Sequence, residues 1–281
     1  IMAKDKYSAV WVSHSSMGDF LKCPRAYYLH NVYKDPKTGR KINIVNPALS
    51  LGIAVHEVVE NLLNFPASDR PKQPLFANFD LAWLKISGQK GGFVDEDEEE
   101  QYRIRGRNMI ERVMAHPGPL LNKAIKLPEH ENGMPPNFYL SEEENIILCG
   151  KIDWLEYLPE TDSLHVIDFK TGKNEEAGDS LQLPIYLLLL NNLQKRKVTK
   201  ASYWYLETED DLKPILLPDS AEAFEKVFDV ALQVKKAREG NNFECRNGGC
   251  FNCKPFEKIL AGEAEYLGIG GYGQDIYYVK K

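Results

Sequence analysis

Two aspartates and a lysine near the middle of this 281-residue chain have the residue types of a metal site. Asp168 and Lys170 are two positions apart, so a β-strand would point both side chains to one face. Asp153 lies in the preceding β-rich segment, and the turn residues at 159–163 predict an antiparallel hairpin. Unpaired charges are costly to bury. We therefore predict that the carboxylates hold Mg²⁺ or Mn²⁺, while the ammonium stabilises negative charge or orients a water molecule.

Polar residues on two predicted helices are candidates to join this site. The helix over 48–64 carries His56 and Glu60 on one face, but this pattern lacks the second histidine of the zinc proteases. Taken alone, His56 is more typical of a surface or internally bonded histidine. The apolar helix over 179–197 places Gln182 and Tyr186 four positions apart. Those two side chains face either the acidic hairpin or solvent.

The five cysteines indicate a second site. Cys250 and Cys253 have the spacing that lets two thiolates bind one ion or cluster, and Cys245 is close enough to join them. Three thiolates are an incomplete tetrahedral set. Cys23, at a predicted helix break before a proline, is the obvious fourth ligand, because Cys149 lies on a predicted strand and is interpreted as packing. In a reducing compartment such cysteines indicate metal or cluster binding before disulfides.

The order of the predicted elements favours a mixed α/β fold. Helices come first, followed by the hairpin, a helix, a strand and a last helix. We expect one domain over 1–281, with a mainly helical part over 1–137, a catalytic α/β core over 138–238, and a cysteine segment and tail over 239–281. The glycine-rich tail from 262 onward receives no role.

Composition and charge limit the function. The chain is 43% hydrophobic, which allows a sizeable core, and its formal charge of −6 argues against a surface coated with phosphate-binding residues. Much of the acidic excess lies in the run 95–100, interpreted as a solvated face or mobile loop. The arginines of the next helix, over 99–115, either contact phosphate or balance that run. No apolar stretch is long enough to span a membrane and no signal peptide is recognised, so a cytoplasmic location is expected.

Taken together, these pieces resemble the RecB-type branch of the PD-(D/E)XK nuclease superfamily, including its CRISPR-associated and single-domain exonucleases. The resemblance runs along almost the whole chain and depends on the order and combination of motifs that are individually weak. The matching motifs are Phe20-Leu-Lys-Cys-Pro-Arg-Ala-Tyr-Tyr28, Gly52-Ile-Ala-Val-His56, Gly150-Lys-Ile-Asp153, Val166-Ile-Asp-Phe-Lys-Thr-Gly172, Leu181-Gln-Leu-Pro-Ile-Tyr186 and the C-terminal cysteines.

The resemblance implies a restriction-endonuclease-like core, in which helices flank a mixed central sheet. It also implies roles for single residues. These are metal binding by His56, Asp153, Asp168 and the carbonyl of Phe169, catalysis by Lys170, and support of the site by Gln182 and Tyr186.

The resemblance further implies a [4Fe–4S] cluster held by Cys23, Cys245, Cys250 and Cys253, which would fasten the two ends of the chain together. One departure matters. The commoner family pattern has a further cysteine after the Cys-x-x-Cys pair, whereas this chain has none there, and Cys245 would have to substitute. Structural zinc is therefore the alternative ligand.

The implied activity is a Mg²⁺- or Mn²⁺-dependent exodeoxyribonuclease acting on single strands or duplex ends in DNA repair, recombination or CRISPR-type processing. No phosphate-binding loop of the helicase type is present, so a helicase, like a CRISPR adaptation protein, would be a separate partner. The alternative is a nuclease-fold subunit that binds DNA or a helicase and cleaves little. The intact acidic residues and lysine argue against it. A zinc-ribbon scaffold protein would leave the acidic hairpin unexplained.

Overall fold

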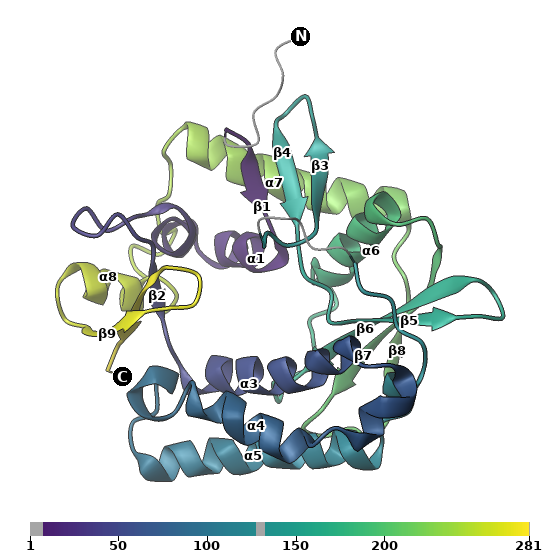
Figure 1. The fold of residues 1–281 in the computed structure, drawn as a ribbon. Coiled ribbons are helices and arrows are strands. Elements are labelled where there is room, and N and C mark those ends of the chain that lie inside the picture. The colour runs from purple at the N-terminus through teal and green to yellow at the C-terminus, as the bar shows by residue number, and fades with distance from the viewer. Residues whose placement is uncertain (1–7, 128–132, 281) are drawn as a thin grey trace.

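The computed structural model describes residues 8–127 and 133–280, and its mixture of helices and mixed sheets confirms the α/β class. Helices α3, α4 and α5 lie together on one side of the molecule, and α1, α6 and α7 lie on the other (Figure 1). The helices are α1 (His14–Lys22), α2 (Pro24–Tyr27), α3 (Pro47–Asn61), α4 (Leu75–Leu84), α5 (Glu96–Ala115), α6 (Gln182–Leu193), α7 (Ser220–Glu239) and α8 (Lys254–Leu260).

The central four-stranded sheet has the order β5-β6-β7-β8. The predicted antiparallel hairpin is present as β5 and β6, and β6 pairs in parallel with β7. Parallel neighbours need a crossover connection, and α6 provides it by returning the chain to the side of the sheet where β6 begins. The strands are β1 (Val10–Val12), β2 (Ile42–Ile44), β3 (Asn137–Ser141), β4 (Ile146–Cys149), β5 (Trp154–Leu158), β6 (Ser163–Lys170), β7 (Val198–Tyr205), β8 (Lys213–Ile215), β9 (Glu265–Ile269) and β10 (Asp275–Tyr278).

Helices cover both faces of this sheet, so its strands are buried on both sides. Ile167 and Phe169 of β6 pack with residues of α3, α4 and α5, whereas Leu164 and Val166 pack with α6 and α7. Successive residues of a strand point to opposite faces. Asp168 therefore points to the face of the sheet that α6 covers, the same face as Leu164 and Val166.

The β-rich segment that carries Asp153 is not one strand, because the structure divides it into β4 and β5. Residues 150–153 form no strand, and β4 pairs with β1 and β3 instead of continuing into the central sheet. Gly150 lies against α6, where an added Cβ atom would be 2.9 Å from Cδ1 of Leu189. The chain turns at this close approach. Asp153 consequently lies in the bend that enters β5 and not on a regular strand face.

The glycine-rich tail forms a third sheet with an N-terminal strand, in the order β2-β10-β9. Asp275 at the start of β10 is fully buried. It accepts hydrogen bonds from Thr38 Oγ1 at 2.5 Å and from Arg40 Nε at 2.7 Å. The tail is thereby fastened to the N-terminal part of the chain, as the parallel pairing of β1 with β4 also joins distant segments.

The acidic run 95–100 is the N-terminal turn of α5, not a mobile loop. The Asp95 side chain caps the helix by accepting from the Glu98 backbone N–H at 2.8 Å. Glu99 accepts from Trp83 Nε1 at 3.0 Å and from the Gly88 backbone N–H at 2.8 Å. Carboxylates at a helix N-terminus also interact favourably with the helix dipole.

The arginines of α5 are paired with carboxylates of the fold. Arg105 binds both carboxylate oxygens of Glu207, at 2.9 and 2.7 Å. Arg103 and Arg107 share Asp80 of α4 in partly exposed ion pairs. The charges of these arginines are therefore balanced within the fold, although not by the acidic run alone. In the described part of the chain, no helix is long and apolar enough to cross a membrane.

Candidate active site and cysteine site

Lys170 is the last residue of β6, and its half-buried side chain is surrounded by polar groups. Its Nζ lies 3.0 Å from Asp168 Oδ2 and 2.8 Å from Glu176 Oε2, and it donates a hydrogen bond to Gln182 Oε1. The ammonium also lies over the ring of Tyr203, 4.8 Å from its centroid. Burial alone would lower the pKa of Lys170, but the negative charges of Asp168 and Glu176 raise it above its ordinary value. Lys170 is thus held as an ammonium.

Asp168 is held by the first turn of α6. Its Oδ1 accepts hydrogen bonds from Gln182 Nε2 at 2.7 Å and from Tyr186 Oη at 2.8 Å. Gln182 and Tyr186 face the acidic hairpin, and the alternative that they face solvent is excluded because both are buried. Burial, followed by the charge of Asp168, raises the pKa of Tyr186 well above its ordinary value, so it remains a hydrogen-bond donor.

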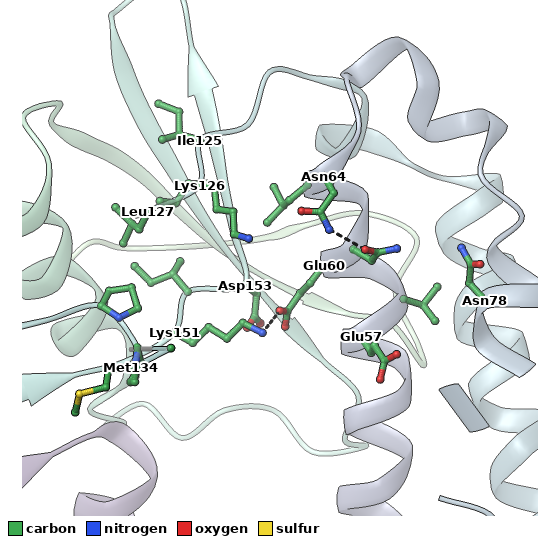
Figure 2. Close-up of a pocket in the computed structure, with 18 of the residues that line it drawn as sticks. Glu57, Glu60, Asn64, Asn78, Ile125, Lys126, Leu127, Met134, Lys151 and Asp153 are labelled. Atoms are coloured by element: carbon green, nitrogen blue, oxygen red, sulfur yellow. Dashed lines mark hydrogen bonds and ion pairs between the residues drawn. The ribbon is translucent and has the colours of Figure 1, made fainter. Parts of the chain in front are cut away.

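A second group of ligand atoms lies beside this one, on α3 and the bend before β5. His56, Glu60 and Asp153 each offer one ligand atom, and these atoms lie within 4.8 Å of one another. His56 Nδ1 is 3.0 Å from Glu60 Oε1 and 3.6 Å from Asp153 Oδ1. Figure 2 shows Lys151 reaching across to Glu60 beside Asp153, at the wall of a groove of about 990 Å³.

A glycine allows α3 to approach the end of β6. An added Cβ atom on Gly52 would lie 3.1 Å from Oγ1 of Thr171, the residue that follows Lys170. That distance is tighter than an ordinary van der Waals contact. A larger residue would push α3 away and carry His56, one turn later on the same helix, with it. This is a physical reason for glycine in the segment that precedes His56.

Backbone atoms of β6 connect the two groups. The Phe169 N–H, between Asp168 and Lys170, donates to Asp153 Oδ2 at 2.9 Å. The Phe169 ring packs with Trp154 and Trp204 in the core, which fixes this part of β6. A metal-binding role for the Phe169 carbonyl stays a prediction.

The electrostatics of the site favour a bound cation. Burial and then the charge of Asp168 raise the pKa of Asp153 to about 8. Burial alone would lower the pKa of His56, but Glu60 and Asp153 raise it to about 9. Asp153 and His56 therefore hold their protons more tightly than usual, because negative charge has accumulated around them. Carboxylates are ligands for Mg²⁺ and Mn²⁺, and imidazole is a ligand for first-row transition metals, so this donor set can hold a divalent ion.

The sequence analysis placed Asp168 among the metal ligands and noted Glu60 only as a neighbour of His56 on one helix face. In the structure, Asp168 lies outside the compact group of ligand atoms, and Glu60 belongs to it. The spacing of four residues from His56 was the available signal for Glu60. Glu176 was missed. It lies in the segment between β6 and α6, which has no periodicity to indicate its direction.

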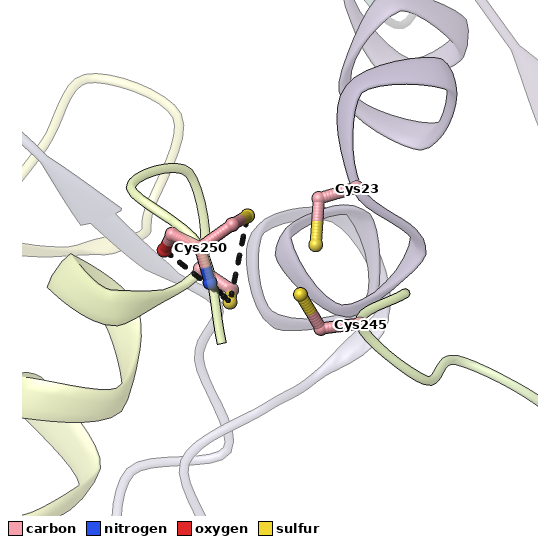
Figure 3. Close-up of side chains that lie close together, drawn as sticks. Cys23, Cys245 and Cys250 are labelled. Carbon is pink, nitrogen blue, oxygen red and sulfur yellow. Dashed lines mark hydrogen bonds between the residues drawn. The ribbon is translucent and has the colours of Figure 1, made fainter. Parts of the chain in front are cut away.

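The four expected cysteines come together from both ends of the chain. The sulfur atoms of Cys23, Cys245, Cys250 and Cys253 lie within 4.8 Å of one another, whereas Cys149 contacts the Val12 carbonyl elsewhere. Figure 3 shows the sulfur atoms of Cys23 and Cys245 pointing toward each other beside the loop that carries Cys250. Such a set can hold structural zinc or an iron–sulfur cluster.

The distances between these thiolates bear on the choice of ligand. The sulfur atoms of Cys250 and Cys253 are 3.8 Å apart. A tetrahedral zinc with bonds of about 2.3 Å separates its sulfur ligands by roughly 3.8 Å. A four-iron cluster places more atoms between the same thiolates and needs them further apart. Backbone N–H groups around Cys253 and Asn252 lower the pKa of Cys250 to about 6, whereas burial raises that of Cys23 to about 12.

Asp168 and Lys170 at the end of β6, with Asp153 immediately before the neighbouring β5, form the arrangement expected of a metal-dependent nuclease. The family comparison gives the same answer, because the model of the PD-(D/E)XK nuclease superfamily matches residues 11–255. The chain belongs to this superfamily, and the match is consistent with its RecB-type branch. Members are nucleases that use divalent metals, and the fold indicates DNA binding. The matched range includes every residue described above at either site.

Proposed function

We propose that this chain is a Mg²⁺- or Mn²⁺-dependent exodeoxyribonuclease that hydrolyses phosphodiester bonds in single-stranded DNA or at duplex ends. The observation that supports this best is the position of Lys170 and Asp168 directly across the Phe169 backbone from His56, Glu60 and Asp153.

Each side chain has a role that its contacts support. His56, Glu60 and Asp153 would hold a divalent ion, and the buried Asp168 is near enough for its charge to act on His56 and Asp153. Such an ion polarises a phosphate and lowers the pKa of a bound water. Gln182 and Tyr186 fix the orientation of Asp168, and Lys170 places a positive charge where negative charge develops on the phosphate. Glu176 holds the Lys170 ammonium in this position.

Cleavage of end-labelled DNA tests the proposal. We expect the wild type to degrade linear strands only when Mg²⁺ or Mn²⁺ is added, and Lys170→Ala and Asp168→Ala to lose at least about 100-fold in rate, as the loss of one charge-stabilising group does elsewhere. Lys173→Ala is a matched control, because Lys173 is exposed in the same loop. Equal rates for the wild type and both active-site variants would exclude this mechanism.

Circular single strands test whether free ends are needed. An exonuclease spares a circle and degrades the linear strand of the same sequence, whereas an endonuclease opens both. Binding without cleavage in either metal would instead support the alternative of a DNA- or helicase-binding subunit. DNA repair, recombination and CRISPR-type processing, with a separate helicase or adaptation protein, are the settings that the family resemblance implies.

We also propose that the four cysteines hold a metal that joins the two ends of the fold and takes no part in hydrolysis. The resemblance supports a [4Fe–4S] cluster, whereas the thiolate spacing supports zinc. Metal analysis of the purified protein distinguishes them. One zinc per chain in a colourless protein would establish zinc, and iron with sulfide and an absorption band near ~400 nm would establish the cluster.

A further inference from the structure

A groove next to the active site concentrates positive charge in an acidic protein. This groove, of about 1250 Å³, contains the charged side chains Lys34, Arg40, Lys41, Lys85 and Lys90, and we call it the cationic groove. None of its described lining residues is acidic, although the whole chain carries a formal charge of −6. Nothing in the described fold requires these positive charges to gather in one groove.

Three of these cations lack an ionic partner. Arg40 is paired with Asp275, and Lys85 is paired with Glu57 at 2.5 Å. Lys34, Lys41 and Lys90 form no ion pair with any residue in 8–127 or 133–280. Their charges face the groove uncompensated and can attract a negatively charged ligand.

The positive charge continues into a smaller cavity of about 400 Å³. That cavity shares Lys34, Lys41 and Asn31 with the cationic groove and adds Arg238 from α7. Burial, followed by the charges of Arg238 and Lys34, lowers the pKa of Lys41. Three like charges from separate parts of the chain repel one another, and a bound anion such as a phosphate would remove that cost.

The cationic groove adjoins the groove of about 990 Å³ beside Glu60 and Asp153, which we call the active-site groove. The two grooves share Lys85 and the aromatic residue Tyr272. Tyr272 lies in the turn between β9 and β10, and its side chain is 96% exposed. The buried Asp275 holds the base of this hairpin, so the turn projects from a fixed support (Figure 1). An exposed aromatic ring in the same groove as unpaired cations is the combination that binds single-stranded nucleic acid, with the bases stacking on the ring.

We infer that the cationic groove binds the phosphate backbone of single-stranded DNA and that Tyr272 stacks on a base where the strand enters the active-site groove. This inference rests on the proposed nuclease function and names its substrate. A single strand presents its base faces to an aromatic ring, whereas an intact duplex covers them except at its ends. The hairpin formed by the glycine-rich tail thereby becomes a binding element that guides the strand toward Asp153 and Lys151.

Salt-dependent binding tests the backbone contacts. Fluorescence anisotropy with labelled oligo-dT would use the full chain carrying Lys170→Ala, so that the strand stays intact. Replacing Lys34 and Lys41 together with alanine is expected to reduce the slope of log K against log salt by about 1.4, since each lost phosphate contact in a single strand contributes about 0.7. Lys195→Ala with Lys226→Ala removes the same charge from exposed sites outside the grooves and should leave the slope unchanged. Equal slopes for the two double variants would refute the groove as the backbone site.

Stacking has its own test at Tyr272. Tyr272→Leu is expected to weaken oligo-dT binding roughly 5- to 150-fold, whereas Tyr272→Phe keeps the ring and should bind like the parent. A 2-aminopurine strand should lose fluorescence on binding the parent and the Phe variant but less on binding the Leu variant. Unchanged affinity of Tyr272→Leu would refute stacking. So would equal losses for the Phe and Leu variants.

A covalently closed, relaxed circular duplex, which has no ends and no unpaired loop, decides between strand types. It should bind more weakly than oligo-dT and should not respond to Tyr272→Leu, and an equal response would refute the single-strand assignment. These binding results are independent of hydrolysis. A cleaving enzyme with an unchanged salt slope would refute this inference alone, whereas a non-cleaving protein that shows the expected slopes would refute only the proposed function.

Discussion

Raising the pH should destabilise the metal-free protein through His56, and the size of the effect follows from its surroundings. Glu60 at 3.0 Å and Asp153 at 3.6 Å raise the pKa of His56 from 6.5 to about 9 in the folded chain. A group with a raised folded pKa stabilises the fold fully below its unfolded pKa. That contribution is lost as the pH rises through the folded value, because the folded state binds the extra proton.

The two pKa values of His56 set the size of its contribution to the free energy of unfolding. Each tenfold difference in proton affinity corresponds to about 1.4 kcal/mol, so His56 contributes about 3 kcal/mol at low pH. This contribution should disappear between about pH 6.5 and pH 9. Asp153, whose pKa is raised to about 8, acts in the same direction, because its ionisation also becomes harder on folding.

Urea unfolding of metal-free wild type and His56→Gln across this pH range is the assay. The difference between the two proteins cancels the titration of unrelated groups, including the cysteines. We expect the advantage of the wild type to shrink by about 3 kcal/mol from about pH 6 to about pH 9.5. Saturating Mn²⁺ should stabilise the wild type more at the higher pH, because a metal-bound histidine must be neutral. A pH-independent difference between the two proteins would refute the reasoning.

Three further outcomes are expected. Tyr186→Phe removes a buried donor to Asp168 and should lower the free energy of unfolding by about 1.5–3 kcal/mol in urea titrations; an unchanged value would mean that Gln182 alone holds the carboxylate. Cys245→Ala should lose the bound metal and lower Tm by roughly 5–15 °C in calorimetry, whereas Cys149→Ala, outside the site, should keep its metal content. Asp275→Ala leaves the donors of Thr38 and Arg40 unpaired and should lower the free energy of unfolding by about 1–3 kcal/mol; retention of wild-type stability would show that the hairpin does not need this anchor.

Local spacing predicted the part of the site that lies within one or two elements. Asp168 and Lys170 share a face because strand side chains alternate, and Gln182 and Tyr186 share a face because helix side chains recur after four residues. The turn residues at 159–163 correctly predicted the antiparallel hairpin of β5 and β6. These relations depend only on the chain within about one element of each residue, so no knowledge of the fold was needed.

Relations between distant elements were harder to infer. The break at residues 150–153 depends on the close approach of Gly150 to Leu189, which a strand-like run of residues does not reveal. The arginines of α5 could not be assigned before Asp80 and Glu207 were placed beside them. The tail had no recognisable pattern, because its pairing partner β2 lies at the other end of the sequence.

The joining of distant segments also sets an order of events during synthesis. Cys23, β1 and β2 leave the ribosome before their partners Cys253, β4 and β10. Contacts between such distant segments form slowly, and apolar surface stays exposed until they do. The four-cysteine site can therefore form only in a chain that has been synthesised past Cys253.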